Sequence, residues 1–124
     1  MNKWQSMVKE FHDAALATVN VRPTVISVPD QILRHQLIDE ELCELENAMA
    51  KEDIVEIADA IGDLLYVVLG TAVSHGIDID PIFHEIHRSN MTKFIDGHRR
   101  SDGKWIKGPS YTPANLLPIL QRQG

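Results

Sequence analysis

Apolar residues recur every three or four positions over most of the chain between Trp4 and about Ile95, which is the spacing of amphipathic helices. Capping residues divide this pattern into four predicted helices. Asp30 is the expected N-cap of the second helix, Gly76 is the C-cap of the third, and Asp80 before Pro81 is the N-cap of the fourth. Counting these caps, the predicted helices cover residues 4–19, 30–50, 54–76 and 80–95.

Two segments lack the helical spacing. Residues 22–29 carry prolines around a short run rich in Val and Ile, which predicts an extended connector with room for a short edge strand. Beyond Asp96, Gly and Pro recur every few residues, so we expect an extended C-terminal arm with an apolar anchor at its end. The anchor residues are Leu116, Leu117, Ile119 and Leu120. The whole pattern predicts one all-α domain over residues 1–124, a four-helix bundle followed by this arm.

The composition indicates the setting in which this domain works. With 44% hydrophobic and 24% charged residues, the 124-residue chain is ordinarily globular, and a domain of this size often completes its core by association. Cys43 is the only cysteine, which excludes an internal disulfide and indicates a reducing compartment. No apolar signal follows Met1, and the longest uncharged apolar stretch, residues 64–73, is too short to span a bilayer. We therefore expect a cytoplasmic protein with no membrane segment.

Charge is distributed unevenly along the chain. Residues 30–63 hold eleven acids against two basic residues, whereas residues 88–107 hold six basic residues against two acids. With a net charge of −6, the chain lacks the dominant basic face that a nucleic-acid-binding protein needs. An acidic block followed by a basic tail suits a metal ion that bridges to a phosphorylated small molecule.

Four carboxylates within the acidic block are candidate metal ligands. Glu41 and Glu44 share one helix face, and Asp59 and Asp63 interrupt an otherwise apolar helix. If the two helices form a hairpin that turns near residue 52, Glu41 lies level with Asp63, and Glu44 lies close to Asp59. Such carboxylates repel one another unless a cation lies between them, and an all-oxygen ligand set fits Mg²⁺ or Mn²⁺. A solvated acidic face is the simpler reading of the helix-two pair.

Glu56 has two open readings. Asp53 and Glu56 have the three-residue spacing of an N-cap and its capping-box partner. Glu56 also shares a helix face with Asp59 and Asp63, where it would be a further ligand or an outer carboxylate.

The basic tail holds candidate phosphate donors and aromatic rings. A solvated tail explains them equally well, and the rings either stack on a base or fix the arm. The candidates are Asn90, Lys93, Lys104, Trp105, Lys107 and Tyr111.

Four segments resemble the MazG-like all-α nucleoside triphosphate pyrophosphohydrolases, especially their short phage and bacterial members, which are related to phosphoribosyl-ATP pyrophosphohydrolase. The segments are LIDEELCEL at 37–45, EIADAIGDLLY at 56–66, HRSNMTK at 87–93 and DGKWIKGPSY at 102–111. One feature departs from larger MazG proteins, whose ExxD motif with its Asp at Asp63 would place a Glu at Ala60. Glu41, Glu44 and Asp63 match in either alignment, and the hairpin register adds Asp59.

The resemblance implies Mg²⁺-dependent hydrolysis of a nucleoside triphosphate to its monophosphate and pyrophosphate, in a helical homo-oligomer that is usually a tetramer. The bundle would then be completed by oligomerisation. We expect a (deoxy)nucleotide substrate such as the purine dGTP, in a phage or bacterial nucleotide pool. The expected roles are metal ligands at Glu41, Glu44, Asp59 and Asp63, a water-activating base at Glu40 or Glu56, and substrate binding by Asn90, Lys93, Lys107 and Tyr111.

Three alternatives stay open. A related enzyme acting on phosphoribosyl-ATP or dUTP would share the acidic helices. A non-catalytic oligomer that binds metal or nucleotide would keep the carboxylates without turnover. A pure interaction module would leave Asp59 and Asp63 unexplained.

Overall fold

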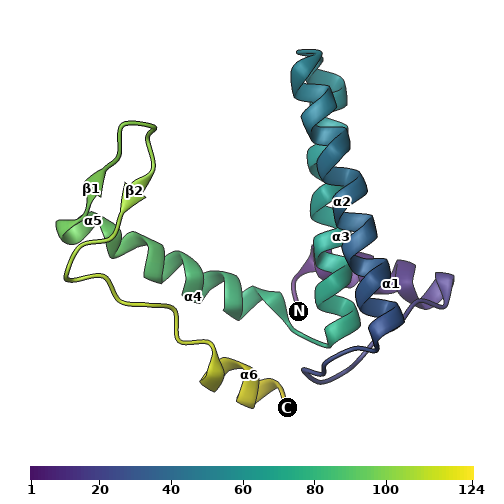
Figure 1. Ribbon diagram of the computed structural model, residues 1–124. Coiled ribbons are helices and arrows are strands. Elements are labelled where there is room, and N and C mark those ends of the chain that lie inside the picture. The colour runs from purple at the N-terminus through teal and green to yellow at the C-terminus, as the bar shows by residue number, and fades with distance from the viewer. The chain divides into compact units, whose positions relative to one another are not determined.

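The computed structural model describes all 124 residues and is mostly helical with only two short strands, which confirms the all-α fold (Figure 1). Its elements are α1 (Lys3–Ala15), α2 (Val28–Ala50), α3 (Ile54–His75), α4 (Ile79–Met91), α5 (Lys93–Asp96), β1 (His98–Arg99), β2 (Trp105–Ile106) and α6 (Leu117–Gln123). The chain divides into two compact units, Met1–Asp78 and Ile79–Gly124, below called unit 1 and unit 2. No helix is long and apolar enough to cross a membrane.

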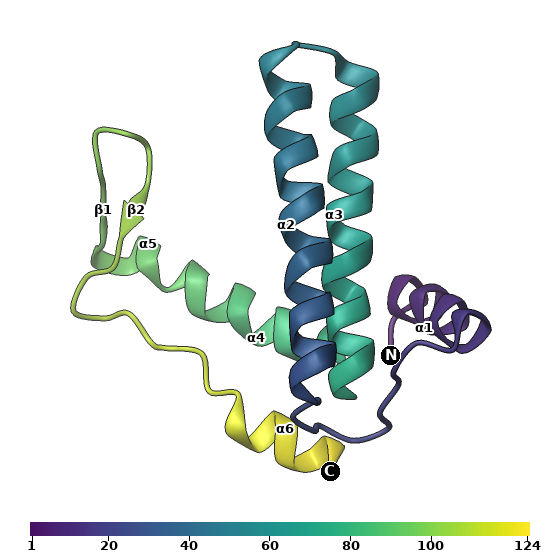
Figure 2. The same cartoon turned by 45° about the vertical axis from the view of Figure 1, so that its right-hand side comes forward.

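Unit 1 is built around a long antiparallel hairpin of α2 and α3, with α1 packed against α3 (Figure 2). The hairpin turns over residues 51–53, where Glu52 adopts a left-handed backbone with φ of 54°, and the predicted turn near residue 52 is confirmed. Ala48 and Ala60 are both buried. Small side chains at these positions allow the two helices to approach closely near the turn.

A buried arginine fixes the register of this hairpin. Arg34 of α2 is 7% exposed, and it donates from Nε to Thr71 Oγ1 (3.2 Å) and from Nη2 to the Val67 carbonyl (2.9 Å) on α3. The guanidinium lies against Gly70, where any Cβ would collide with it. Arg34 and Gly70 stand in the register that also places Glu41 level with Asp63. The polar contacts at one end of the hairpin therefore align the carboxylates two turns away.

The start of α2 differs from the prediction. Ser27, rather than Asp30, is the N-cap, and its hydroxyl accepts from the Asp30 amide (3.3 Å). Pro29 falls in the first turn, where a missing N–H is harmless, so the helix begins earlier than expected. The Asp30 carboxylate instead accepts from the Thr18 hydroxyl (2.7 Å). The connector over residues 22–27 forms no strand.

Two other helix boundaries also need correction. Helix α1 ends at Ala15 rather than near Val19, because Leu16 adopts a left-handed backbone (φ 58°) that closes the helix. Helix α4 begins at Ile79, with Asp80 inside its first turn, and ends at Met91 before the short α5. The predicted C-cap at Gly76 is confirmed, with φ of 68°.

Only part of the predicted apolar stripe of α1 faces the core. The residues of α1 that are buried are Gln5, Val8 and His12. Trp4, Met7 and Phe11 keep 62%, 54% and 55% of their surface exposed. The buried side of α1 is therefore partly polar, and its most apolar side is open in the single chain.

The segment of unit 2 after Asp96 contains more regular structure than the extended arm that the sequence predicts. Strands β1 and β2 form an antiparallel hairpin in which His98 pairs with Ile106 and Arg99 with Trp105. The apolar anchor near the C-terminus is largely helical, because α6 takes in three of its four residues, and Ile119 is its buried member. Helix α6 has only 7 residues, which is too short for the spacing of apolar residues to reveal it.

Candidate metal centre

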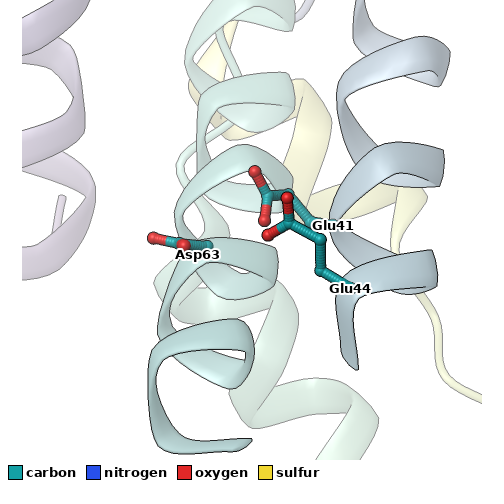
Figure 3. Close-up of side chains that lie close together, drawn as sticks. All are labelled: Glu41, Glu44 and Asp63. Carbon is teal, nitrogen blue, oxygen red and sulfur yellow. The ribbon is translucent and has the colours of Figure 1, made fainter. Parts of the chain in front are cut away.

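Three carboxylates meet on the facing sides of the α2–α3 hairpin. Glu41 and Glu44 lie one turn apart on α2, and Asp63 lies opposite on α3, with ligand oxygens all within 4.8 Å of one another (Figure 3). Glu41 and Asp63 are half-buried and Glu44 is exposed. The hairpin register places Glu41 level with Asp63, as the sequence predicts.

The cluster carries negative charge that no protein group neutralises. Glu41 Oε2 is buried and has no hydrogen-bond partner. Burial, then the charge of Glu44 and a hydrogen bond with its side chain, and then the charge of Asp63 raise the pKa of Glu41. Burial also raises the pKa of Asp63, helped by the charges of Asp59 and Glu44. A buried, unpaired carboxylate oxygen is costly, and a hard divalent cation such as Mg²⁺ or Mn²⁺ is the partner that an all-oxygen donor set suits. The residues present therefore fit such an ion.

The other predicted carboxylates lie around this cluster. Asp59 is outside the three-residue group, but its charge acts on Asp63. Asp59 also lines a cavity of ≈ 270 Å³ together with Glu44 and Glu56, near the hairpin turn. Glu40 is exposed on α2, and its charge contributes the smallest part of the rise in the Glu41 pKa. The structure thus brings Glu41, Glu44 and Asp63 together and keeps Asp59, Glu56 and Glu40 at the margin.

The structure supports part of each of the two interpretations of Glu56. Asp53 caps α3 by accepting from the amides of Val55 (3.0 Å) and Glu56 (3.2 Å). The Glu56 carboxylate does not return the bond to the Asp53 amide and instead meets Lys51 Nζ at 3.4 Å. Half of the capping box is therefore present, and the Glu56 side chain faces the cavity that it shares with Glu44 and Asp59.

The predicted substrate-binding residues all belong to unit 2. Lys93, Lys107 and Tyr111 line one cavity of ≈ 290 Å³, and Asn90 is exposed on α4 outside its lining. The cavity also includes Lys104 and Trp105, which the sequence offers as donor and ring without assigning them to a site. The Asp-Gly pair before Lys104 is the sequence feature that could have placed Lys104 and Trp105 in this site. A Gly after Asp is typical of a tight hairpin, which brings its flanking side chains together.

Comparison with known proteins agrees with the fold and the acidic hairpin. The sequence profile of the family described as phosphoribosyl-ATP pyrophosphohydrolase matches residues 8–90. An uncharacterised protein of Acanthamoeba polyphaga mimivirus is 48% identical over 48 residues, which are 39% of this chain and 19% of that protein. The profile match takes in α2, α3 and all six acidic candidates, and it ends at Asn90. This chain belongs to the phosphoribosyl-ATP pyrophosphohydrolase family, within the MazG-like all-α nucleoside triphosphate pyrophosphohydrolases.

Proposed function

We propose that the protein is a cytoplasmic enzyme that hydrolyses a nucleoside triphosphate to its monophosphate and pyrophosphate, with Mg²⁺ or Mn²⁺ as cofactor. The family implies a nucleotide pyrophosphohydrolase, and the proposal adds the substrate and the metal. The observation that carries it is the cluster of Glu41, Glu44 and Asp63 with the unpartnered Glu41 oxygen. A solvated acidic face would not place a carboxylate oxygen out of reach of both water and donors.

Some of the carboxylates would bind the ions, and another would accept a proton. Glu41, Glu44, Asp59 and Asp63 would hold the ions, which when bound offset the charge that develops on the phosphate oxygens. Water attacks the α-phosphorus, the bond from that phosphorus to the bridging oxygen breaks, and pyrophosphate leaves. Glu40 or Glu56 takes the proton of the attacking water. Glu56 is favoured, because it shares a cavity with Glu44 and Asp59.

The substrate proposed is a purine deoxynucleotide such as dGTP, with its phosphates held by Asn90, Lys93 and Lys107 and with Tyr111 beside them. The family match favours phosphoribosyl-ATP as the second candidate. Both contain the same triphosphate, so the carboxylate cluster serves either one.

The test is pyrophosphate release by the purified protein with Mg²⁺ or Mn²⁺. The substrates are the eight common NTPs and dNTPs, dUTP and phosphoribosyl-ATP, with EDTA as control. Metal-dependent conversion of one or two nucleotides to monophosphate supports the proposal and gives the base preference. Turnover of phosphoribosyl-ATP alone replaces the proposed substrate. No turnover in folded protein favours the non-catalytic oligomer.

We also propose that the protein self-associates, as a homotetramer, through the open apolar surface of unit 1. Trp4, Met7 and Phe11 of α1 are more than half exposed, and the Phe11 ring meets the Tyr66 ring edge-on at 5.8 Å. Apolar patches of this kind mark interfaces. Light scattering after size exclusion should give four times the chain mass, and Phe11→Glu should reduce it. A monomer at micromolar concentration would refute the proposal.

A further inference from the structure

A buried histidine lies where α1 meets the α2–α3 hairpin. His12, in the last turn of α1, is 3% exposed, and no step of the proposed reaction uses it. Its Nε2 lies 2.9 Å from the point that a Cβ at Gly70 of α3 would occupy, and Nη2 of Arg34 from α2 lies closer still to that point. The imidazole and the guanidinium are therefore neighbours at the junction of three helices.

A backbone carbonyl decides which nitrogen of the His12 ring takes up a further proton. The Nδ1 atom lies 3.2 Å from the Thr18 carbonyl oxygen. A carbonyl can only accept a hydrogen bond, so Nδ1 carries the hydrogen of the neutral ring. The unprotonated nitrogen is then Nε2, on the side of Gly70 and Arg34. A second proton therefore places a positive charge beside the guanidinium.

Burial and Arg34 both oppose that proton. Burial lowers the pKa of His12 from its ordinary 6.5, the bond to the Thr18 carbonyl raises it in part, and the charge of Arg34 lowers it again. The Asp13 carboxylate raises the pKa least, and it already pairs with Lys9 Nζ at 2.9 Å. The net change is downward, so a protonated His12 ring is unfavourable in the docked position.

Other titratable side chains of the packed elements have partners of their own or are exposed. They are Asp30 of α2, which accepts from the Thr18 hydroxyl (2.7 Å), His75 of α3, whose Nδ1 lies 2.7 Å from the Thr71 carbonyl, Tyr66 of α3, whose ring packs against Phe11, and the exposed Arg22 of the connector. Asp13 is therefore the acid whose charge favours a protonated His12, and its effect is small.

Few buried side chains hold α1 to the hairpin. Helix α1 buries Gln5, Val8 and His12, and Gln5 Nε2 donates to the Ile77 carbonyl (2.6 Å). Only one of these three side chains is aliphatic, so little apolar surface opposes the release of α1. A segment with few buried apolar contacts opens separately from the rest of a domain. A buried charge that has no close partner is costly, and release of α1 would return it to water.

We propose that His12 is a pH-sensitive switch, in which addition of a proton to Nε2 releases α1 from the α2–α3 hairpin. The released ring binds the proton more strongly than the docked ring does. Docking is therefore at its full strength above 6.5, the ordinary pKa of histidine, and weakens as pH falls from there toward the lowered pKa of the docked ring.

The switch would also control self-association. The open apolar surface with Trp4, Met7 and Phe11 belongs to α1, so its geometry is lost when α1 leaves the hairpin. Mild acid should then dissociate the oligomer. This consequence rests on the proposed function, whereas the release of α1 does not.

The test is amide hydrogen exchange of the metal-free full chain between about pH 7.5 and about pH 5, with correction for intrinsic exchange rates. The protection of α1 should fall by up to about tenfold per pH unit below 6.5, because release takes up one proton, and α2 and α3 should lose none. His12→Asn keeps a donor for the Thr18 carbonyl but cannot be protonated, so its α1 protection should not depend on pH. His35→Asn, at an exposed histidine of α2, is the matched control and should respond as the wild type does.

Two results of this experiment would overturn the proposal. One is a wild-type α1 whose protection does not change with pH, and the other is an equal loss of protection in His12→Asn. If His12→Asn does not fold, NMR titration of the wild-type His12 ring decides. A midpoint below 6.5 that coincides with the loss of α1 protection supports the switch, and a midpoint at or above 6.5 overturns it.

Light scattering at the same pH values separates the switch from the proposed self-association. A mass that falls on acidification in the wild type but not in His12→Asn supports both. A monomer at every pH, together with pH-dependent exchange of α1, refutes the self-association alone.

Discussion

Units 1 and 2 differ in the sign of the charged side chains that they bring together. Unit 1 holds fourteen Asp and Glu against five Lys and Arg, and unit 2 holds four against seven. In unit 1 carboxylates converge without partners, and the pKa values of Glu41 and Asp63 are raised. In unit 2 Arg88 lowers the pKa of Glu85 and Arg100 lowers that of Asp102, while the lysines converge instead.

This difference shows where each unit is incomplete. A carboxylate that meets an arginine is satisfied within the protein and has a structural role. A carboxylate or an ammonium group held among its own kind needs an outside partner of opposite sign. Under the proposed function, the carboxylates of unit 1 would take a cation and the lysines of unit 2 would take an anion. A nucleoside triphosphate with its divalent ion carries both kinds of charge, so the contrast between the units agrees with one substrate class.

The largest expected effect comes from removing a carboxylate of unit 1. Asp63→Asn and Glu41→Gln keep the side-chain shape and remove one charge each. We expect either change to lower kcat/KM about 100-fold, because altering even the groups that orient a metal ligand costs about 10- to 100-fold. Pyrophosphate release with Mg²⁺ measures it. Glu46→Gln, an exposed acid of α2 outside the cluster, is the control. Full turnover by both cluster variants would show that neither Glu41 nor Asp63 holds a metal ion that turnover needs.

Added metal should stabilise unit 1 selectively. Mg²⁺ at a hundred times its Kd raises the free energy of unfolding by about 2.7 kcal/mol when only the folded state binds it. Thermal unfolding followed by helical circular dichroism, with and without EDTA, measures the change. Asp63→Asn should lose the response to Mg²⁺ and should melt at or above the wild-type temperature in EDTA, because one repulsive charge is gone. An equal Mg²⁺ shift in this variant would show that the ions bind elsewhere.

The sequence predicts the acidic half of this contrast better than the basic half. Helical spacing predicts the two long helices, and the turn expected near residue 52 predicts the register that brings Glu41 to Asp63. Spacing does not show that α1 buries Gln5, Val8 and His12 and leaves its large apolar side chains exposed, because burial normally favours the more apolar side of a helix. Ser27 and Asp30 are both good caps, and Pro29 decides between them by fitting only the first turn. The cavity lined by Lys93, Lys104 and Lys107 depends on two-residue strands and on close contacts at Gly97 and Gly108, which the spacing of apolar residues does not reveal.

A single methyl group should damage unit 2 and leave unit 1 intact. In Gly108→Ala the new Cβ meets the backbone and carboxylate of Asp96, and we expect a local loss of about 1–3 kcal/mol. Faster amide hydrogen exchange at Ser110 and weaker tripolyphosphate binding would show it, with the Mg²⁺ shift unchanged. Gly62→Ala is the matched control, since its Cβ meets nothing within 4 Å and a helical Ala stabilises by up to about 1 kcal/mol. Unchanged exchange in Gly108→Ala would contradict the close packing of Gly108 against Asp96.

The smallest effect is an opposite pH response of the two units in metal-free protein. Glu41 and Asp63 have folded-state pKa values above their ordinary 4.5 and 3.8, so their contribution to stability is complete below those values and is lost as pH rises through the raised ones. Glu85 and Asp102 have lowered pKa values, so their contribution is present above 4.5 and 3.8 and is lost as pH falls through the lowered ones. Carboxyl carbon NMR titration in EDTA should therefore place the unit 1 pair above the unit 2 pair. Mg²⁺ should move the unit 1 pair alone, and downward, because an ion favours the charged form. A titration in which Glu41 and Asp63 ionise below Glu85 and Asp102 without metal would mean that the carboxylates of unit 1 already have partners, and the contrast between the units would fail at its origin.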